Sequence, residues 1–350
     1  MVPQVSGVGG MVSFRAKFTA GLQARGIEVT PDPKLSTPDA LLVIGGTRDL
    51  PGLWRARRRG LRIVQRLNGM NWLHRLQRTG SKHYLRAEYG NWILNTIRTR
   101  LADHIVYQSE FSRRWWQRVY GPAPVPNSVV YNAVDLAVYR PQSGSPKVPP
   151  SAYRVLLVEG SLLGGYELGL ETAVRLVERL NTVHRAELAA SIAPSAAKAG
   201  AHPVELVVAG RVSEAVQARW ARQSDTPIRW MGLVPADEIP ALDRSAHLLY
   251  SSDINAACPN SVIEALACGL PVLAFDTGAL PELVSGEAGR VVPYGGDPWK
   301  LEPPDIPALA EAALEILADQ PRFRTAARAR AESAFGLDAM LDGYLQALEV

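Results

Sequence analysis

The chain has 350 residues, of which 47% are hydrophobic, so it is long enough for two domains of ordinary size, each with its own core. No apolar run approaches the roughly 20 residues of a membrane-spanning helix, and no charged and then apolar leader is visible. We therefore expect a cytoplasmic protein. Two cysteines, Cys258 and Cys268, exclude a disulfide framework and a four-cysteine zinc site, and we expect both to be packing residues.

The charge is divided unevenly along the chain. Residues 1–140 carry 21 Lys and Arg against 8 Asp and Glu, a balance of +13, whereas the remaining residues carry 17 against 26, a balance of −9. A half this basic, with the run at residues 55–59, attracts acidic partners such as nucleic acid, an anionic membrane surface or a phosphorylated acceptor. A solvated helix face explains the same charges equally well.

The first half alternates strand and helix patterns. Residues 1–5 suit a short first strand, and Gly7, Gly9 and Gly10 follow before a helical pattern over residues 11–25. A glycine-rich turn between a strand and a helix lets the backbone approach a phosphate closely, although this signal alone is weak. Residues 39–46, 61–67 and 104–109 predict further strands, and residues 50–60, 80–101 and 110–120 predict helices.

Two features of this half bear on a site. Asn68 stands at the end of the strand at residues 61–67, where open α/β sheets bind ligands, and its amide can hydrogen-bond a hydroxyl. The pair Trp115 and Trp116 is better explained as core than as a base-stacking platform.

Residues 141–152 are rich in Pro and Ser and predict a linker. A second series follows it: strands at 153–159, 204–210, 228–232 and 247–251, and helices at 167–181, at 184–202 with a break near Pro194, and at 238–245. Arg211 comes directly after one of these strands, where it can reach a phosphate or, as the plainer alternative, pair with Glu214. From residue 305 onward the pattern is helical, over residues 306–318, 322–335 and 337–348.

The most informative stretch is residues 251–284. Its middle predicts a short helix over residues 260–269, begun by Asn260 and Ser261 and ended by a glycine, and a buried strand follows. The free N–H groups of Asn260, Ser261 and Val262 would favour a diphosphate, and Glu264, one turn in, can accept two hydrogen bonds from a ribose diol. These groups together indicate a nucleotide site, while a buried αβ unit with one solvated Glu fits the pattern as well.

Residues 258–283, CPNSVIEALACGLPVLAFDTGALPEL, resemble the donor-binding segment of the retaining GT-B glycosyltransferases of the family 4 type. Residues 128–141 are similar to that family's motif at the end of its first domain. The resemblance implies an α/β GT-B fold, with two Rossmann-like domains facing each other across a cleft. It also implies transfer of a hexose from a nucleoside-diphosphate sugar, with retention and no further cofactor. Because no Asp-x-Asp occurs in the chain, we expect no metal.

The same resemblance assigns roles to particular residues. Glu264 would hold the ribose hydroxyls, and Gly9 and Gly10 would face the donor. Asn68 takes the position beside the reacting sugar, where the family often has His or Asp. Asn68 is therefore the catalytic candidate. Three positions depart from the family's pattern. Ala256 replaces the acid eight residues before Glu264, and Ser161 and Tyr166 stand in place of the two usual diphosphate cations, for which Arg211 is the candidate substitute.

We expect residues 1–140 to form an acceptor-side domain, residues 153–320 to bind the nucleotide sugar, and residues 321–350 to form helices of which the last packs back on the first domain. The expected partners are the nucleotide-sugar donor and a glycan, lipid-linked or small-molecule acceptor, with contact to the inner face of an anionic membrane through the basic domain and no nucleic acid. A protein that binds a nucleotide sugar or glycan without transfer is the alternative. A nucleotide-sugar epimerase would need a carboxylate and His cluster that the sequence lacks, and a dehydrogenase would need a complete G-x-G-x-x-G.

Overall fold

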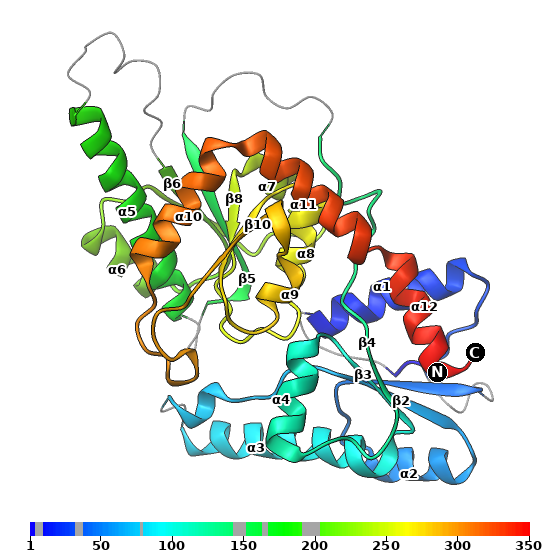
Figure 1. The fold of residues 1–350 in the computed structure, drawn as a ribbon. Coiled ribbons are helices and arrows are strands. Elements are labelled where there is room, and N and C mark those ends of the chain that lie inside the picture. Colours follow the sequence, from blue (N-terminus) through cyan, green and yellow to red (C-terminus); the bar gives the residue numbers. More distant parts are fainter. Residues whose placement is uncertain (4–9, 32–37, 78–79, 143–151, 163–166, 191–203) are drawn as a thin grey trace. The chain divides into compact units, whose positions relative to one another are not determined.

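The computed structural model describes residues 1–3, 10–31, 38–77, 80–142, 152–162, 167–190 and 204–350 (Figure 1). The chain forms two compact units. The first consists of Met1–Val134, Ala256–Asn260 and Ala334–Val350, and the second of Asp135–Asn255 and Ser261–Ser333. Each unit is an α/β layer structure around a parallel sheet, so the expected fold class is confirmed. No helix in the described part of the chain has both the length and the apolar character to cross a bilayer.

The first unit has a parallel sheet in the order β1-β2-β3-β4. Its strands and helices are β1 (Ala40–Ile44), β2 (Arg62–Leu67), β3 (His104–Tyr107), β4 (Asn127–Val129), α1 (Gly10–Ala24), α2 (Leu50–Arg58), α3 (Ser81–Thr96), α4 (Glu110–Tyr120) and α12 (Leu337–Leu348). Short helical turns lie at η1 (Leu73–Arg75) and η2 (Ile97–Leu101). Every residue of β1 is buried, because helices cover both faces of a parallel sheet.

Helix α12, the last of the chain, lies on α1 in this unit. Phe14 and Phe18 of α1 meet the ring of Tyr344 with centroids 5.1 and 5.3 Å apart. A Cβ on Gly21 would come within 2.6 Å of a methyl group of Leu341, so a larger residue here would force that side chain to shift. Apolar contacts with α1 therefore hold α12 in the first unit, where α12 also packs on β1, β2 and β3.

The second unit has a parallel sheet in the order β10-β9-β8-β5-β6-β7. Its strands are β5 (Tyr153–Ser161), β6 (Val204–Arg211), β7 (Ile228–Gly232), β8 (Leu248–Tyr250), β9 (Val272–Phe275) and β10 (Gly289–Val292). Its helices are α5 (Glu167–Ala190), α6 (Glu214–Gln223), α7 (Ile239–Ser245), α8 (Asn260–Ala267), α9 (Leu280–Leu283), α10 (Ile306–Ala318) and α11 (Gln320–Ala334), with turns at η3 (Gly286–Ala288) and η4 (Pro298–Lys300). One apolar core runs between β5, β6, β8, α5 and α10.

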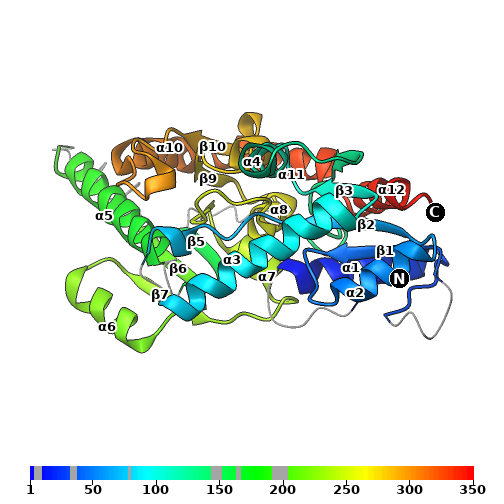
Figure 2. The same cartoon turned by 90° about the horizontal axis from the view of Figure 1, so that it is seen from below.

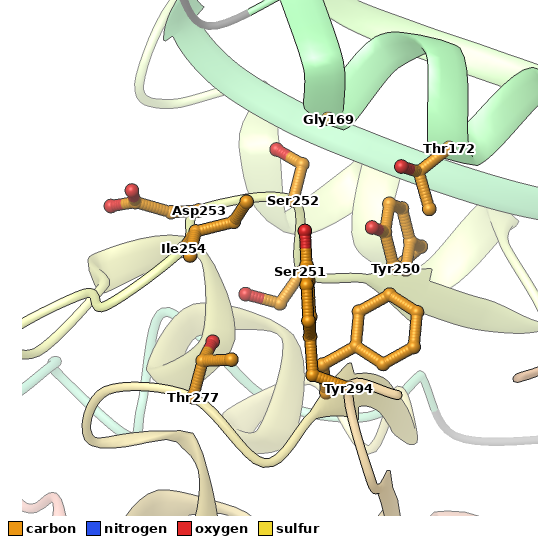
Figure 3. A pocket seen from close by; sticks show the side chains of 10 residues that line it. Gly169, Thr172, Tyr250, Ser251, Ser252, Asp253, Ile254, Thr277 and Tyr294 are labelled. Atoms are coloured by element: carbon orange, nitrogen blue, oxygen red, sulfur yellow. The ribbon is translucent and has the colours of Figure 1, made fainter. Parts of the chain in front are cut away.

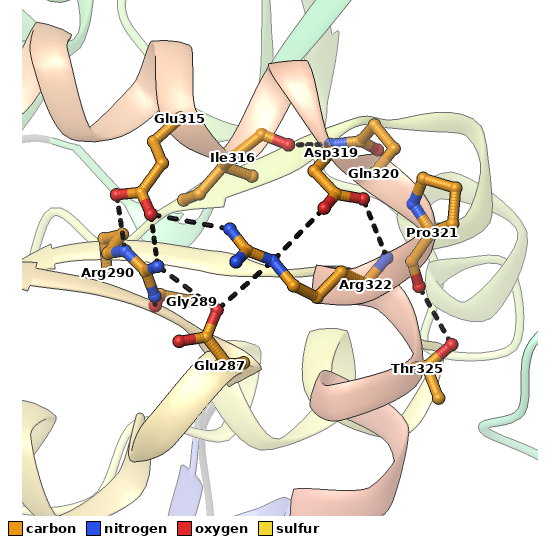
Figure 4. Close-up of polar contacts among 10 residues, drawn as sticks. All are labelled: Glu287, Gly289, Arg290, Glu315, Ile316, Asp319, Gln320, Pro321, Arg322 and Thr325. Carbon is orange, nitrogen blue, oxygen red and sulfur yellow. Dashed lines mark hydrogen bonds and ion pairs between the residues drawn. The ribbon is translucent and has the colours of Figure 1, made fainter.

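A network of charged side chains joins β10, α10 and α11 at the surface of the second unit (Figure 4). Arg290 binds both oxygens of Glu315 and lies 3.2 Å from Glu287, which in turn lies 3.4 Å from Arg322. Both guanidinium groups sit over the ring of Phe323, at 4.5 and 4.7 Å from its centroid. Because several charges share partners, the network holds these elements in register better than isolated surface pairs would.

Some expected elements differ in the structure. Helix α5 continues to Ala190 instead of ending near Asn181, since no Gly or Pro follows Asn181 before Ala190, and the Asn181 amide pairs with both backbone groups of Val204. The last turn of the long helix after residue 80 is a π-helix, Ile97–Leu101. Strand β10 has no counterpart among the expected elements, since its apolar run is very short. The expected helix break near Pro194 and most of the linker fall outside the described residues. Of the expected strand at residues 1–5, residues 1–3 are described and are not assigned to a strand, although the Val2 N–H donates to the Thr30 carbonyl and the Met1 carbonyl accepts from Leu42.

Candidate functional site

The strand order of the second unit locates a ligand-binding edge. Counted from β5, the order is that of a dinucleotide-binding sheet, with β5 and β8 adjacent where the direction of winding reverses. Ligands of open α/β sheets bind outside the carboxyl ends of the strands at this point. Helix α8 follows β8 in the chain, so its amino-terminal end faces this edge.

A pocket opens between β8, β9 and α5 (Figure 3). It is lined by Gly169, Thr172, Tyr250, Ser251, Ser252, Asp253, Ile254, Phe275, Thr277 and Tyr294. The figure shows the hydroxyl groups of Thr172, Ser252 and Thr277 around it. The free space is about that of one water molecule, so the pocket marks the ligand-binding edge of the sheet and is not a cavity of ligand size.

Two acids lie together at this edge. Ser252 donates a hydrogen bond of 3.0 Å to Oε1 of Glu159, which stands near the end of β5. Burial, and next the nearby charge of Asp253, raise the pKa of Glu159, and burial also raises the pKa of Asp253. A proton is therefore retained on this pair to a higher pH than on ordinary carboxyl groups. The edge carries less negative charge than two free carboxylates would give it.

Gly210 on β6 makes this arrangement possible. A Cβ at that position would lie 2.2 Å from the carbonyl oxygen of Glu159, and the backbone has φ +151°. The register between β5 and β6 shifts after Val158, and Ser161 then pairs with Arg211. The irregularity brings the exposed Arg211 to the carboxyl edge beside β5. Among the described residues Arg211 has no ion pair, so the alternative pairing with Glu214 is not observed.

Helix α8 is short and mostly buried. Asn260 and Ser261 are partly buried, Val262 is fully buried, and Glu264 is partly buried one turn further on. The helix ends at Gly269, which has φ +71°. Its free N–H groups at residues 260–262 can bind an anionic group of a ligand, and Glu264, one turn further on, can contact another group of the same ligand.

Glu264 has acidic and phenolic neighbours. Burial and then the charge of Glu264 raise the pKa of Asp243 well above its ordinary value, and the same two effects raise the pKa of the Tyr139 hydroxyl. Asp243 is 1% exposed. Asp243 therefore keeps its proton to a higher pH than an ordinary carboxyl group, which reduces the negative charge beside Glu264.

Asn68 lies at the end of β2 in the first unit and is held on three sides. Its Oδ1 accepts hydrogen bonds from Arg66 at 2.7 Å and from Gln108 at 2.6 Å, and its backbone carbonyl accepts one from Trp116 at 2.7 Å. The amide oxygen is thus occupied within the protein. The Asn68 amide nitrogen is the group left to meet a ligand hydroxyl.

Arg66 is the centre of this cluster. It is 1% exposed, its second Nη donates to Oδ1 of Asn132 at 2.7 Å, and its guanidinium lies 4.1 Å over the ring of Phe14. Burial lowers its pKa, and among the described residues no carboxylate pairs with it. Asn132 in turn donates to the carbonyl of Cys258 at 2.8 Å, two residues before α8. A buried cation thus connects β2 to the chain that leads into α8.

The structure brings some predicted site residues together. In the first unit, a Cβ on Gly10 would lie 3.6 Å from Nδ2 of Asn260, and a small pocket beside them is lined by Ser13, Phe14, Lys17, Asn132, Ala133, Asn260 and Met340. In the second unit, Arg211 lies at the sheet edge and Glu264 on α8. Gly9 and Tyr166 lie outside the described residues. The binding roles of all these residues stay predictions.

Other groups were missed from the sequence. Glu159 and Asp253 lie 94 residues apart in the chain, and neither belongs to a motif, although an acid directly after an apolar strand was a usable signal for Glu159. Arg66 was missed because it stands inside an apolar strand, where burial without a counter-ion is rare. The two tryptophans are buried, as expected, with Trp116 fully so. Within the described residues no group of three His, Cys, Asp or Glu side chains could hold a metal ion.

Two family models match the chain. Residues 35–138 match "Glycosyltransferase Family 4" and residues 173–319 match "Glycosyl transferases group 1". Alpha-maltose-1-phosphate synthase of Mycolicibacterium smegmatis is 27% identical over 251 residues, which are 68% of this chain and 59% of that protein. The chain spans less than two thirds of the length of the curated relatives it matches.

Two solved structures share the fold of the chain. WaaG, a glycosyltransferase involved in lipopolysaccharide biosynthesis, has a TM-score of 0.66 at 13% identity, with 99% of each chain covered. Anabaena Alr3699/HepE, solved in complex with UDP and glucose, has a TM-score of 0.62 at 16% identity, covering 99% of this chain and 98% of that one. At this level of identity, the likeness shows the fold alone.

Proposed function

Because this chain belongs to the glycosyltransferases of family 4 and group 1 and has their GT-B fold, we propose that it transfers a hexose from a nucleoside-diphosphate sugar to an acceptor hydroxyl. The observation that carries this proposal is the position of α8. It follows β8 at the reversal point of the second sheet, and it carries Glu264 one turn from its amino-terminal end.

The donor would bind to the second unit. The N–H groups at the start of α8 attract a diphosphate, and Glu264 accepts hydrogen bonds from the ribose diol. The UDP and glucose bound in Anabaena HepE support a nucleotide-sugar donor and make UDP-glucose a sensible first probe. The donor-facing roles of Gly9 and Gly10 and the catalytic role of Asn68 belong to the same proposal.

The leaving diphosphate needs positive charge as the glycosidic bond breaks. We assign this role to the α8 N–H groups together with Arg211, which is exposed at the sheet edge and has no ion pair among the described residues. Fixed donors and cations of this kind stabilise a developing charge without a metal ion. The proposed reaction is therefore independent of metal. Retention of the anomeric configuration belongs to the proposal through the resemblance to the retaining family alone.

The acceptor would bind to the basic first unit, as a glycan, a lipid-linked sugar or a small molecule. The balance of +13 over residues 1–140 also favours contact between this unit and an anionic membrane surface. The proposal includes no nucleic acid partner.

A binding protein with weak or no transfer is the second candidate, and one observation favours it. Ala256, 5% exposed, stands where the family's pattern has an acid, and the acid pair Glu159 and Asp253 retains a proton because of its raised pKa values. An alanine at this position cannot make the family's usual acid contact to the donor sugar.

The test is thermal unfolding with a panel of nucleoside-diphosphate sugars, followed by a transfer assay with the best donor. A donor at 100 times its dissociation constant adds about 2.7 kcal/mol to the free energy of unfolding. Glu264→Ala should weaken donor binding by about 1.5 to 3 kcal/mol, and Glu311→Ala, an exposed acid on α10, is the matched control. Equal affinity in wild type and Glu264→Ala would contradict the ribose assignment. Tight donor binding without transfer to any acceptor would favour the binding protein.

A further inference from the structure

The exposed side of α3 carries an apolar and aromatic stripe. Leu85, Tyr89 and Trp92 recur at the spacing of one helix face, and their exposed fractions are 67%, 49% and 54%. The rings of Tyr89 and Trp92 stack with centroids 5.7 Å apart. The helix packs on its own unit through other positions, which include the buried Ala87 and Ile93. The stripe is therefore not required for the core of the unit.

Helix α2 extends this surface. Trp54 is 47% exposed, and the guanidinium of Arg58 lies 3.7 Å from its ring centroid. Arg57 donates a hydrogen bond to the carbonyl of Arg100, in the π-helical turn that continues α3. Figures 1 and 2 both show α2 beside this end of α3. Two adjacent helices thus present large aromatic side chains to solvent.

The charges around the stripe are basic. Lys82 and Arg86 lie on the exposed first turns of α3, Arg55 lies on α2, and among the described residues none of the three has an acidic partner. The acid of α3, Glu88, is paired with Arg75 at 2.6 Å, and that hydrogen bond lowers the pKa of its carboxyl group. The surface therefore has unbalanced positive charge beside its aromatic residues.

We propose that this surface, which we call the α3 face and define as Trp54, Leu85, Tyr89 and Trp92, docks on a bilayer with anionic headgroups. Tryptophan and tyrosine favour the membrane interface because the ring is apolar and its polar edge meets the headgroups. Lys and Arg beside them gain roughly 1 kcal/mol each near an anionic surface. An ordinary solvated helix would have charged residues at the positions of Leu85 and Trp92. This inference deepens the proposed membrane contact by naming the surface that makes it.

The test is co-sedimentation of the full chain with lipid vesicles, without donor or acceptor. Vesicles of phosphatidylcholine are compared with vesicles that contain about 30% phosphatidylglycerol. The variant is Leu85→Ser, Tyr89→Ser and Trp92→Ser combined, and the control is Met231→Ser with Leu233→Ser, two exposed apolar residues of the second unit. Thermal unfolding and circular dichroism verify that both variants are folded.

Wild type and control should bind the anionic vesicles, and the triple variant should bind at least about tenfold more weakly, since Leu85 alone contributes roughly one factor of ten when buried. Binding should weaken in about 0.5 M salt. Unchanged binding of the triple variant, equal loss in the control, or no binding by wild type would each overturn the proposal. A wild type that self-associates while the triple variant is monomeric would show instead an interface between copies. Donor stabilisation is measured separately, so its failure would count against the proposed function and leave vesicle binding interpretable.

Discussion

Asn68→Asp places a carboxylate directly in front of the buried Arg66. In the native chain the amide oxygen of Asn68 accepts from Arg66 at 2.7 Å and from Gln108 at 2.6 Å, so an aspartate oxygen at the same position keeps both hydrogen bonds. The change adds one negative charge to a guanidinium that has no carboxylate partner among the described residues. Asn68 is partly buried, so the added charge keeps some of its hydration.

The expected gain follows from these distances. Two unit charges about 4 Å apart attract by about 4 kcal/mol at an effective dielectric constant of about 20, and partial desolvation of the carboxylate offsets part of this. We expect the free energy of unfolding to rise by about 1 to 3 kcal/mol at pH 7. The guanidinium would hold the pKa of the new carboxyl group below its unfolded value of about 3.9. The gain is therefore present above pH 4 and is lost as the pH falls through the folded pKa.

The assay is urea unfolding followed by tryptophan fluorescence, at pH 7 and at several values down to about pH 2, so that the series crosses the depressed pKa. Asn181→Asp is the matched control with the opposite sign, because its amide nitrogen donates to the Val204 carbonyl at 2.9 Å and a carboxylate there would face that carbonyl. It should destabilise by about 1 to 3 kcal/mol. A stability for Asn68→Asp at or below wild type at pH 7, or a gain that survives Arg66→Met, would refute the view of Arg66 as an uncompensated buried cation.

Three other outcomes are expected. Burial raises the pKa of Glu159 from 4.5 to about 8, so the free energy of unfolding of the wild type falls as the pH rises through that range. Glu159→Gln should therefore gain stability relative to wild type between pH 5 and 9. Parallel melting curves at all pH values would contradict this. Gly210→Ala should lower the free energy of unfolding by more than about 1 kcal/mol, because its Cβ would meet the Glu159 carbonyl; Gly160→Ala, with open space around it, is the control in the same urea titration. EDTA should leave transfer unchanged, and a requirement for magnesium or manganese would show that a metal assists the diphosphate.

Local patterns were enough to predict most elements. Helix α4 begins and ends where expected, because Ser109 caps it by accepting a hydrogen bond from the Ser112 N–H and Gly121 ends it with φ +77°. The strands at the cores of both sheets were predicted from apolar runs, since a parallel strand covered on both faces needs no polar alternation. The short helix at residue 260 and its Glu264 were also predicted from local signals.

The elements that sequence reasoning misplaced lacked such signals. The apolar part of β10 is two valines after Gly289 and Arg290, too short to be distinguished from a loop. Asn181 has the residue type of a helix end, but no Gly or Pro follows it before Ala190, so α5 continues. Strand β10 is set by its pairing with β9, a partner elsewhere in the chain.

The chain by itself determined the two α/β series, the charge division between the halves and the residues of α8. Only the tertiary structure placed Ser252 against Glu159, 93 residues away, and Asn132 between Arg66 and the Cys258 carbonyl, 66 and 126 residues away. These contacts depend on which strands become neighbours in each sheet and on the backbone irregularity at Gly210. Strand order is set by the packing of helices on both faces of the sheet, which involves the whole unit at once, and no local run of residues encodes it.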